Sequence, residues 1–183
     1  MADATAPSTT IWEIDPAHST AEFSIRHMMI TTVKGRFSGI TGAVEGDPDD
    51  LTTAKVHLDI DVTTVDTRQP DRDKHLRSAD FFDVEKYPTM SFQSTRITRT
   101  GPNTYDVVGN LTLHGVTKEV VCQVTYEGQN KDPWGGTRAG YTATTTLNRK
   151  DYGLMWNVAL ETGGVLVGDQ VKVSVELETV KKA

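Results

Sequence analysis

Hydrophobic and polar residues alternate along eight stretches of this chain, and the clearest is the sequence VHLDIDV at residues 56–62. A period of two places one face of a β-strand against a hydrophobic interior and the other face in water. Short connections between such stretches favour antiparallel hairpins. A sheet of about eight strands can close into a barrel whose interior holds either packed side chains or one small ligand. The pattern therefore predicts an all-β fold, an eight-stranded antiparallel β-barrel.

Three segments interrupt this alternation. In the glycine-rich stretch 33–44 the phase slips by one residue at Gly39, which is typical of a β-bulge that lets a sheet curl. Residues 69–79 are charged and lack β-branched side chains, so we expect a short helix there. A further turn of helix is expected within residues 151–160. Such helices would act as lids or plugs over the barrel, and the sequence leaves that choice open.

Length and charge limit the possible classes of protein. The 183 residues fit one domain, which we place at residues 11–181 after a disordered tail at residues 1–10. A net charge of −6 without a basic cluster argues against nucleic-acid binding. No stretch approaches the ~20 apolar residues of a membrane helix, and the N-terminal residues lack a signal-peptide pattern. We therefore expect a cytoplasmic protein without stable membrane insertion.

The sequence contains no recognisable catalytic or metal-binding motif. The five histidines show no metal-ligand spacing, and the single cysteine, Cys122, lies on an apolar strand face where a thiol is usually inert. We expect no metal. The best candidates for buried acid chemistry are Asp73, Asp80 and Asp151, because each lies beside a histidine or an arginine in an irregular segment. The commoner role of such carboxylates is to anchor these segments to the barrel through ion pairs.

The predicted interior is aliphatic and aromatic but also includes small residues, namely Gly35, Gly39, Gly109 and Ala143. Small residues inside a barrel either create a cavity or make room for a large neighbour. Methionines such as Met155 are equally suited to contact with a hydrophobic ligand and to a packed core. Periodicity alone therefore leaves a ligand cavity and a filled core open.

A series of motifs, in order along residues 11–180, resembles the YceI-like polyisoprenoid-binding family. The motifs are DPAHS at 15–19, FSIRH at 23–27, VKGRF at 33–37, RDKHLRSADFFDVEKYP at 72–88, GNLTLHGVTK at 109–118 and NRKDYG at 148–153. The resemblance implies a lipocalin-like, eight-stranded barrel that holds a long isoprenoid chain, such as a polyprenyl alcohol, a polyprenyl phosphate or a quinone tail. It supplies no catalytic residue and no required cofactor, and it is compatible with a homodimer.

With this ligand in mind, we predict which side chains meet it. The expected wall consists of Phe23, Ile25, Phe37, Val56, Leu58, Ile60, Phe92, Leu111, Leu113, Met155 and Trp156. Polar groups at the mouth are expected to meet a head group or, equally, to fix the helix and loops against the barrel; they are His27, Arg72, His75 and Arg149. Burying each CH₂ contributes about 0.8 kcal/mol, so a long prenyl tail needs few polar contacts.

Three functions follow as hypotheses. The first is a non-enzymatic carrier or store of isoprenoid lipid. The second is an enzyme that modifies such a lipid with an acid such as Asp73 or Asp151. The third is a structural β-domain with a filled core. A continuous internal cavity would separate the first two from the third.

Overall fold

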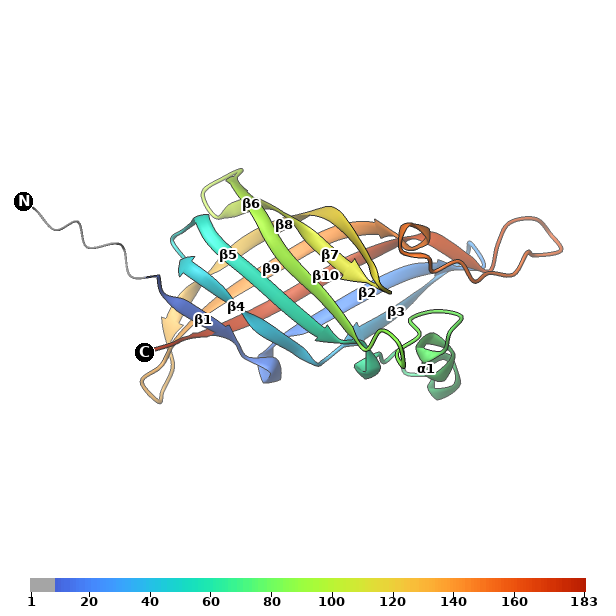
Figure 1. Ribbon diagram of the computed structural model, residues 1–183, viewed down its shortest axis with the longest axis horizontal. Coiled ribbons are helices and arrows are strands. Elements are labelled where there is room, and N and C mark those ends of the chain that lie inside the picture. Colours follow the sequence, from blue (N-terminus) through green and yellow to red (C-terminus); the bar gives the residue numbers. More distant parts are fainter. Residues whose placement is uncertain (1–8) are drawn as a thin grey trace, which may run out of the picture.

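The structure is a computed structural model that describes residues 9–183, and it consists mainly of long antiparallel strands (Figure 1). The strands are β1 (Ile11–Ile14), β2 (Thr20–His27), β3 (Thr31–Phe37), β4 (Ile40–Asp47), β5 (Asp50–Asp61), β6 (Thr89–Arg99), β7 (Thr104–Leu113), β8 (Val116–Lys131), β9 (Thr137–Asn148) and β10 (Val167–Lys181). The helical segments are α1 (Pro70–Arg77) and the 3₁₀ turns η1 (Pro16–His18), η2 (Val62–Thr64) and η3 (Arg149–Tyr152). The disordered tail expected at residues 1–10 lies mostly outside the described residues.

The sheet closes on itself. Its strands follow the order β1-β4-β5-β6-β7-β8-β9-β10-β2-β3, and β1 also pairs with β10. Along β10, Thr179 faces Ile14 of β1 and Glu176 faces Thr20 of β2, so β1 and β2 together form one long strand interrupted by η1. Strands β3 and β4 form a second interrupted strand, broken at Ser38 and Gly39. The ten segments therefore make a closed eight-stranded antiparallel barrel, as the alternation predicted.

The phase slip at Gly39 is a break between two strands rather than a bulge within one. After it β4 pairs with β5 from Ile40 onward, whereas β3 meets the segment after β5 only at the isolated bridge between Arg36 and Asp66. The chain can bend here because Gly39 has no side chain: a Cβ at this position would lie 2.8 Å from Cβ of Asp61. Strand β3 thus stays paired with β2 but parts from β5, on the side of the barrel where α1 lies (Figure 1).

Helix α1 forms where the charged, unbranched segment predicted it. The side chain of Gln69 caps its start by accepting hydrogen bonds from the amides of Asp71 and Arg72, and Pro70 occupies the first turn, where its missing N–H costs nothing. Arg77 places a positive charge in the last turn, which suits the helix dipole. The second predicted helical segment is displaced. The single turn η3 ends at Tyr152, so it overlaps the predicted range 151–160 only at its first two residues, and residues 153–160 are not helical.

The end of the barrel that carries the start of β1 and the C-terminus is filled with side chains. Trp12 and Tyr105 are buried there, near the ends of their strands. Outside this plug, Arg138 donates hydrogen bonds to Asp15 Oδ2 at 2.7 Å and to Glu178 Oε1 at 2.6 Å.

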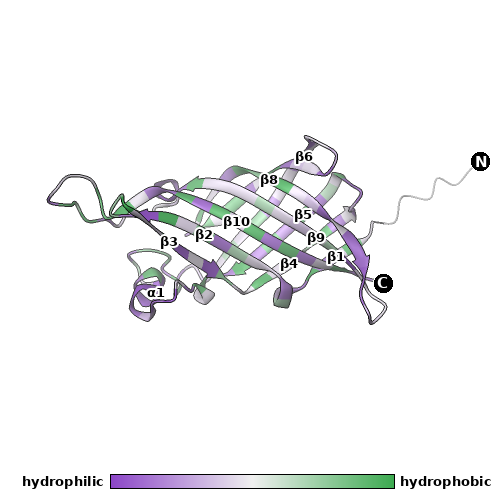
Figure 2. Cartoon of the chain, turned by 180° about the vertical axis from the view of Figure 1, so that it is seen from behind, coloured by the Kyte–Doolittle hydropathy of each residue, from purple (hydrophilic) through white to green (hydrophobic). Residues whose placement is uncertain are grey.

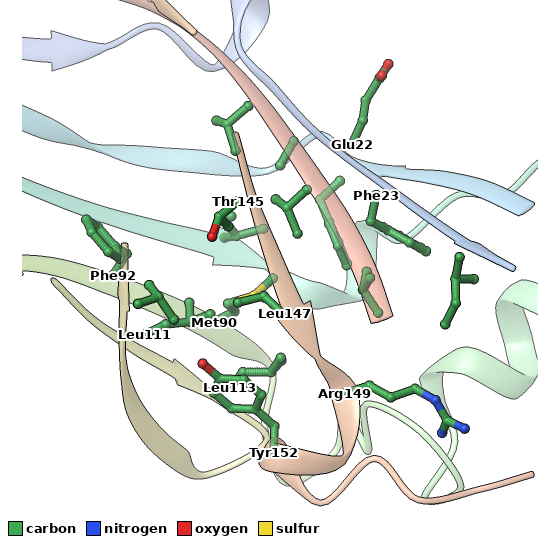
Figure 3. Close-up of a pocket in the computed structure, with 18 of the residues that line it drawn as sticks. Glu22, Phe23, Met90, Phe92, Leu111, Leu113, Thr145, Leu147, Arg149 and Tyr152 are labelled. Atoms are coloured by element: carbon green, nitrogen blue, oxygen red, sulfur yellow. The ribbon is translucent and has the colours of Figure 1, made fainter. Parts of the chain in front are cut away.

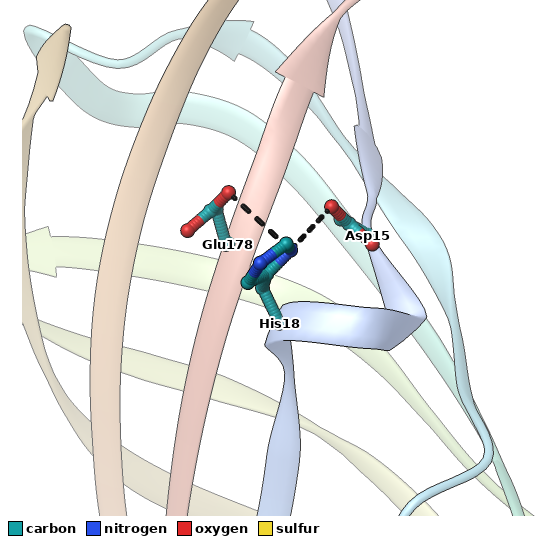
Figure 4. Close-up of side chains that lie close together, drawn as sticks. All are labelled: Asp15, His18 and Glu178. Atoms are coloured by element: carbon teal, nitrogen blue, oxygen red, sulfur yellow. Dashed lines mark hydrogen bonds and ion pairs between the residues drawn. The ribbon is translucent and has the colours of Figure 1, made fainter. Parts of the chain in front are cut away.

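His18 joins these groups. Its Nδ1 lies 2.8 Å from Asp15 Oδ2 and 3.8 Å from Glu178 Oε1 (Figure 4). Hydrogen bonds from His18 and then from Arg138 lower the pKa of Asp15 to about 2. Arg138, together with His18 when it is protonated, thus balances the charge of these carboxylates, and the cluster ties β1, η1, β9 and β10 together.

Candidate functional site

The other part of the barrel encloses an apolar cavity of about 370 Å³. This volume is within the range of pockets that hold small organic ligands. Its lining is almost wholly aliphatic and aromatic, and it draws on residues from β2 to β10, α1 and the segment between η3 and β10. Figure 3 shows Met90, Phe92, Leu111, Leu113 and Leu147 converging on this space from several strands.

The wall follows from the period of two. Val56, Leu58 and Ile60 of β5 line the cavity, whereas His57 between them is exposed on the outer face. The same alternation of hydrophobic and polar residues runs along β10 in Figure 2. Inward side chains such as Phe92 remain only partly buried, because they face a void instead of a packed neighbour. The structure therefore contains a cavity and excludes a completely filled core.

Two glycines make room for aromatic rings of the wall. A Cβ on Gly35 would lie 2.3 Å from Cζ of Phe23, and a Cβ on Gly109 would lie 2.4 Å from Cζ of Phe92. In both cases the ring lies over the glycine of a neighbouring strand. Of the two roles that the sequence left open for small residues, Gly35 and Gly109 accommodate a large neighbour, while Ala143 lines the cavity.

Helix α1 and the segment before β10 close the barrel over the cavity with an aromatic cluster. The His75 ring stands edge-on to Trp156, with ring centroids 4.7 Å apart, and edge-on to Phe81 at 5.0 Å. His75 Nε2 also lies 2.8 Å from Asp80 Oδ2, which fixes the orientation of the ring. His75 and Trp156 both line the cavity, so this cluster serves as its lid.

Arg72 is a cation held in position at the mouth. Its Nε donates to Thr67 Oγ1 at 2.7 Å and its Nη2 to the Thr67 carbonyl at 2.8 Å. The buried carboxylate of Asp73 accepts from the same threonine, from the amide at 2.9 Å and from Oγ1 at 2.5 Å. Arg72 Nη1 makes no hydrogen bond to any residue between 9 and 183 and is free to meet an oxygen of a ligand.

Arg149 has a different role. It is buried, and it donates to four backbone carbonyls, those of Leu154 at 2.6 Å, Trp156 at 2.9 Å, Gly168 at 2.8 Å and Val167 at 3.4 Å. Burial lowers the pKa of Arg149 from its usual value. This guanidinium holds the segment between η3 and β10 against the barrel. Of the two roles considered for it, it therefore has the second, fixing a loop against the barrel.

Every residue of the predicted wall except Met155 lines the cavity. Met155 is 58% exposed and lies outside the cavity. The reason is local: Arg149 binds the carbonyls of Leu154 and Trp156, and the side chain of Met155 between them faces solvent. His27, Arg72, His75 and Arg149 all lie at the cavity with the apolar wall. Whether these residues contact a ligand stays a prediction.

Part of the wall lies outside the predicted set. Val171, Val173, Val175 and Leu177 of β10 line the cavity, and their alternation with polar residues was a sufficient signal. Cys122 lines it too, and burial raises the pKa of its thiol to about 11, so the thiolate is disfavoured.

Tyr141 is a further wall residue outside the predicted set. Its buried hydroxyl has no hydrogen-bond partner among residues 9–183, and burial raises its pKa beyond the usual range.

The carboxylates considered for acid chemistry are engaged elsewhere or exposed. Asp73 binds Thr67, Asp80 binds His75, and Asp151 is an exposed residue of η3. Each of the first two fixes a segment at the mouth of the barrel.

A closed antiparallel barrel around one apolar cavity defines a lipocalin-like barrel. The chain belongs to the YceI-like family, because the model of the YceI-like domain matches residues 12–179. A UPF0312 protein of Staphylococcus aureus is 39% identical over 170 residues, covering 92% of this chain and 96% of the relative. A UPF0312 protein of Pseudomonas putida is 43% identical over 137 residues, covering 75% of this chain and 71% of the relative.

Solved structures share the fold. The Campylobacter jejuni YceI protein is 26% identical, with a TM-score of 0.72, over 86% of this chain and 90% of that one. Burkholderia cenocepacia BcnA is 23% identical, with a TM-score of 0.77, over 90% and 98%. A polyisoprenoid binding domain from Saccharophagus degradans is 18% identical, with a TM-score of 0.69, over 92% and 97%. None of the helices among residues 9–183 has the length and hydrophobicity needed to cross a bilayer.

Proposed function

We propose that this barrel binds the prenyl chain of an isoprenoid lipid in its cavity and carries or stores it without catalysis. The observation that supports this most strongly is the almost uninterrupted hydrocarbon lining of the cavity. Apolar burial contributes roughly 25 cal/mol per Å², so a chain surrounded on all sides binds by contact area alone. A protein of the same fold, from Saccharophagus degradans, is described as a polyisoprenoid binding domain.

The proposal places the polar end of the lipid at the mouth. Arg72 is preorganised by Thr67 and has Nη1 available, so it is the side chain best suited to an oxygen of a head group. His75 lies beside it in the lid. The proposal needs no metal, cofactor or catalytic residue; a cytoplasmic location and a homodimer stay predictions.

The test is binding of geranylgeraniol, detected by native mass spectrometry and by tryptophan fluorescence. Leu58→Trp fills the cavity with an indole and should abolish binding. His57→Trp is the matched control, because it adds the same side chain on the outer face of the same strand and should leave binding unchanged. Equal binding by both variants, or no binding by the unmodified protein, would contradict the proposal.

The head-group part of the proposal has a separate test. Arg72→Gln should weaken binding of geranylgeranyl phosphate by about tenfold, the scale of one charge-assisted hydrogen bond, and should leave binding of geranylgeraniol nearly unchanged. An equal loss for both ligands would instead mean that Arg72 only supports the local structure.

A further inference from the structure

Two turns expose apolar side chains beside the mouth of the cavity. We call this set the rim surface; it consists of Met28, Met29 and Ile30 between β2 and β3, and of Met155, Val158 and Val165 between η3 and β10. Ile30 is 71% exposed and Met29 is 61% exposed. Both turns project from the end of the barrel beside α1, away from β1 and the C-terminus (Figures 1 and 2).

The two parts of the rim surface are joined. The amide of Met28 donates to the carbonyl of Leu166 at 2.8 Å, and the sulfur of Met29 lies against Gly164. Leu166 and Trp156 line the cavity, while their chain neighbours Val165 and Met155 face solvent. Apolar surface therefore continues from the outside of the rim to the inner wall of the cavity.

The turn that carries the methionines is conformationally unfavourable for them. Met28 has φ of 52° and Met29 has φ of 61°, and the amide of Ile30 donates to the carbonyl of His27 at 3.1 Å. Positive φ at two successive residues is the pattern of a type I′ turn, in which Asn-Gly is strongly preferred because both central residues need positive φ. Residues held in such conformations cluster at functional sites. Arg26 stabilises the turn, because its Nη2 donates a hydrogen bond to the Met29 carbonyl at 3.1 Å.

Large exposed apolar patches mark contact with proteins or with membranes. Here the patch consists of the tips of two turns beside the opening of an apolar cavity. Projecting turns of this kind are suited to penetrating the surface of a bilayer. A prenyl chain is nearly insoluble in water and resides in bilayers, so a bilayer supplies an apolar phase for the rim surface and for the ligand together. The continuity between rim and cavity thus favours a lipid surface.

We infer that the rim surface inserts shallowly into a lipid bilayer, so that the prenyl chain passes between bilayer and cavity without crossing water. This inference rests on the proposed function. Insertion is driven by apolar contact, since the protein carries a net charge of −6 and lacks a basic cluster. Binding should therefore occur on phosphatidylcholine vesicles and persist at high salt.

The test is flotation with phosphatidylcholine vesicles. The double variant Met28→Asn, Met29→Gly replaces the methionines with the residues that the turn prefers, so it should fold at least as stably as the parent. Its vesicle partition coefficient should nevertheless fall by about tenfold or more, the scale of losing one buried apolar side chain. Trp134→Ser is the control, because Trp134 is 85% exposed in the turn between β8 and β9, at the opposite end of the barrel.

A selective loss in the Asn-Gly variant, with Trp134→Ser unchanged, supports the inference. Absence of flotation by the parent protein, equal flotation by the Asn-Gly variant, or an equal loss in Trp134→Ser would overturn it. Binding of geranylgeraniol without vesicles reports separately on the proposed function. If the parent protein does not bind geranylgeraniol, the cavity proposal is contradicted. If the Asn-Gly variant binds geranylgeraniol as the parent does, its loss of flotation is assigned to the contact with the bilayer.

Discussion

The ring of Phe23 lies over Gly35 of the adjacent strand, so that a Cβ at residue 35 would be 2.3 Å from its Cζ. This contact places an aromatic wall residue where an ordinary side chain would collide with it. Gly35→Ala should therefore displace the ring, cost about 1–3 kcal/mol of stability, as overpacking typically does, and weaken binding of geranylgeraniol. Urea denaturation and ligand titration measure the two effects.

Gly140→Ala is the control for this substitution. A Cβ there would make an ordinary contact of 3.6 Å with Cβ of Glu127, in a strand position without unusual φ. It should change stability little. If Gly35→Ala were equally tolerated, the close approach of Phe23 and Gly35 would not constrain the wall.

The alternation of hydrophobic and polar residues was enough to predict the barrel and most of its wall. Val56, Leu58 and Ile60 face inward because alternate residues of a strand share one face of the sheet. This holds equally for a filled and for a hollow barrel. The existence of a cavity could not be predicted in this way. It depends on whether side chains from opposite strands meet across the barrel, and no local pattern records that distance.

The segment between η3 and β10 shows the other limit. Met155 and Trp156 are neighbours with similar hydrophobicity, and nothing in the sequence separates them. The buried guanidinium of Arg149 separates them, since it binds the carbonyls on either side of Met155 and so turns that side chain outward. A residue that acts on backbone atoms several positions away leaves no periodic signal.

Arg149 should therefore be required for stability and lid position. Arg149→Met leaves the carbonyls of Leu154, Trp156 and Gly168 without their donor and should cost about 3 kcal/mol or more. Thermal unfolding measures the loss. The neighbouring Lys150→Met, on an exposed side chain, is the control and should have a small effect. Similar stability of the two variants would contradict the role assigned to Arg149.

Tyr141 should limit the stability of the empty protein. Its hydroxyl is buried at the cavity without a partner among the described residues, so Tyr141→Phe removes an unsatisfied polar group and keeps the ring. We expect a gain of about 1 kcal/mol in the free energy of unfolding. Tyr126→Phe, at a partly buried neighbour, is the comparison. A loss of stability in Tyr141→Phe would show that the hydroxyl has a favourable interaction in solution.

His18 should make the closed end of the barrel sensitive to pH. The hydrogen bond to Asp15, and then the charge of Glu178, raise the pKa of His18 above its usual 6.5. A raised pKa in the folded state means that the contribution to stability is complete below about pH 6.5 and is lost as the pH rises through the folded pKa. The low pKa of Asp15, about 2, acts in the opposite direction: its contribution is present above its ordinary pKa of 3.8 and is lost in stronger acid.

The stability of the parent protein relative to His18→Gln should consequently be greatest at about pH 5.5 and smaller at about pH 8.5. Urea unfolding of both proteins at the two pH values measures the difference. His57→Gln serves as the control, because His57 is exposed on the outer face of β5 and forms no ion pair within residues 9–183. A stability difference for His18→Gln that stays constant with pH would show that His18 is not the charged partner of Asp15 and Glu178. A difference that grows toward alkaline pH would reverse the sign of the linkage and exclude the protonated imidazole as the stabilising form.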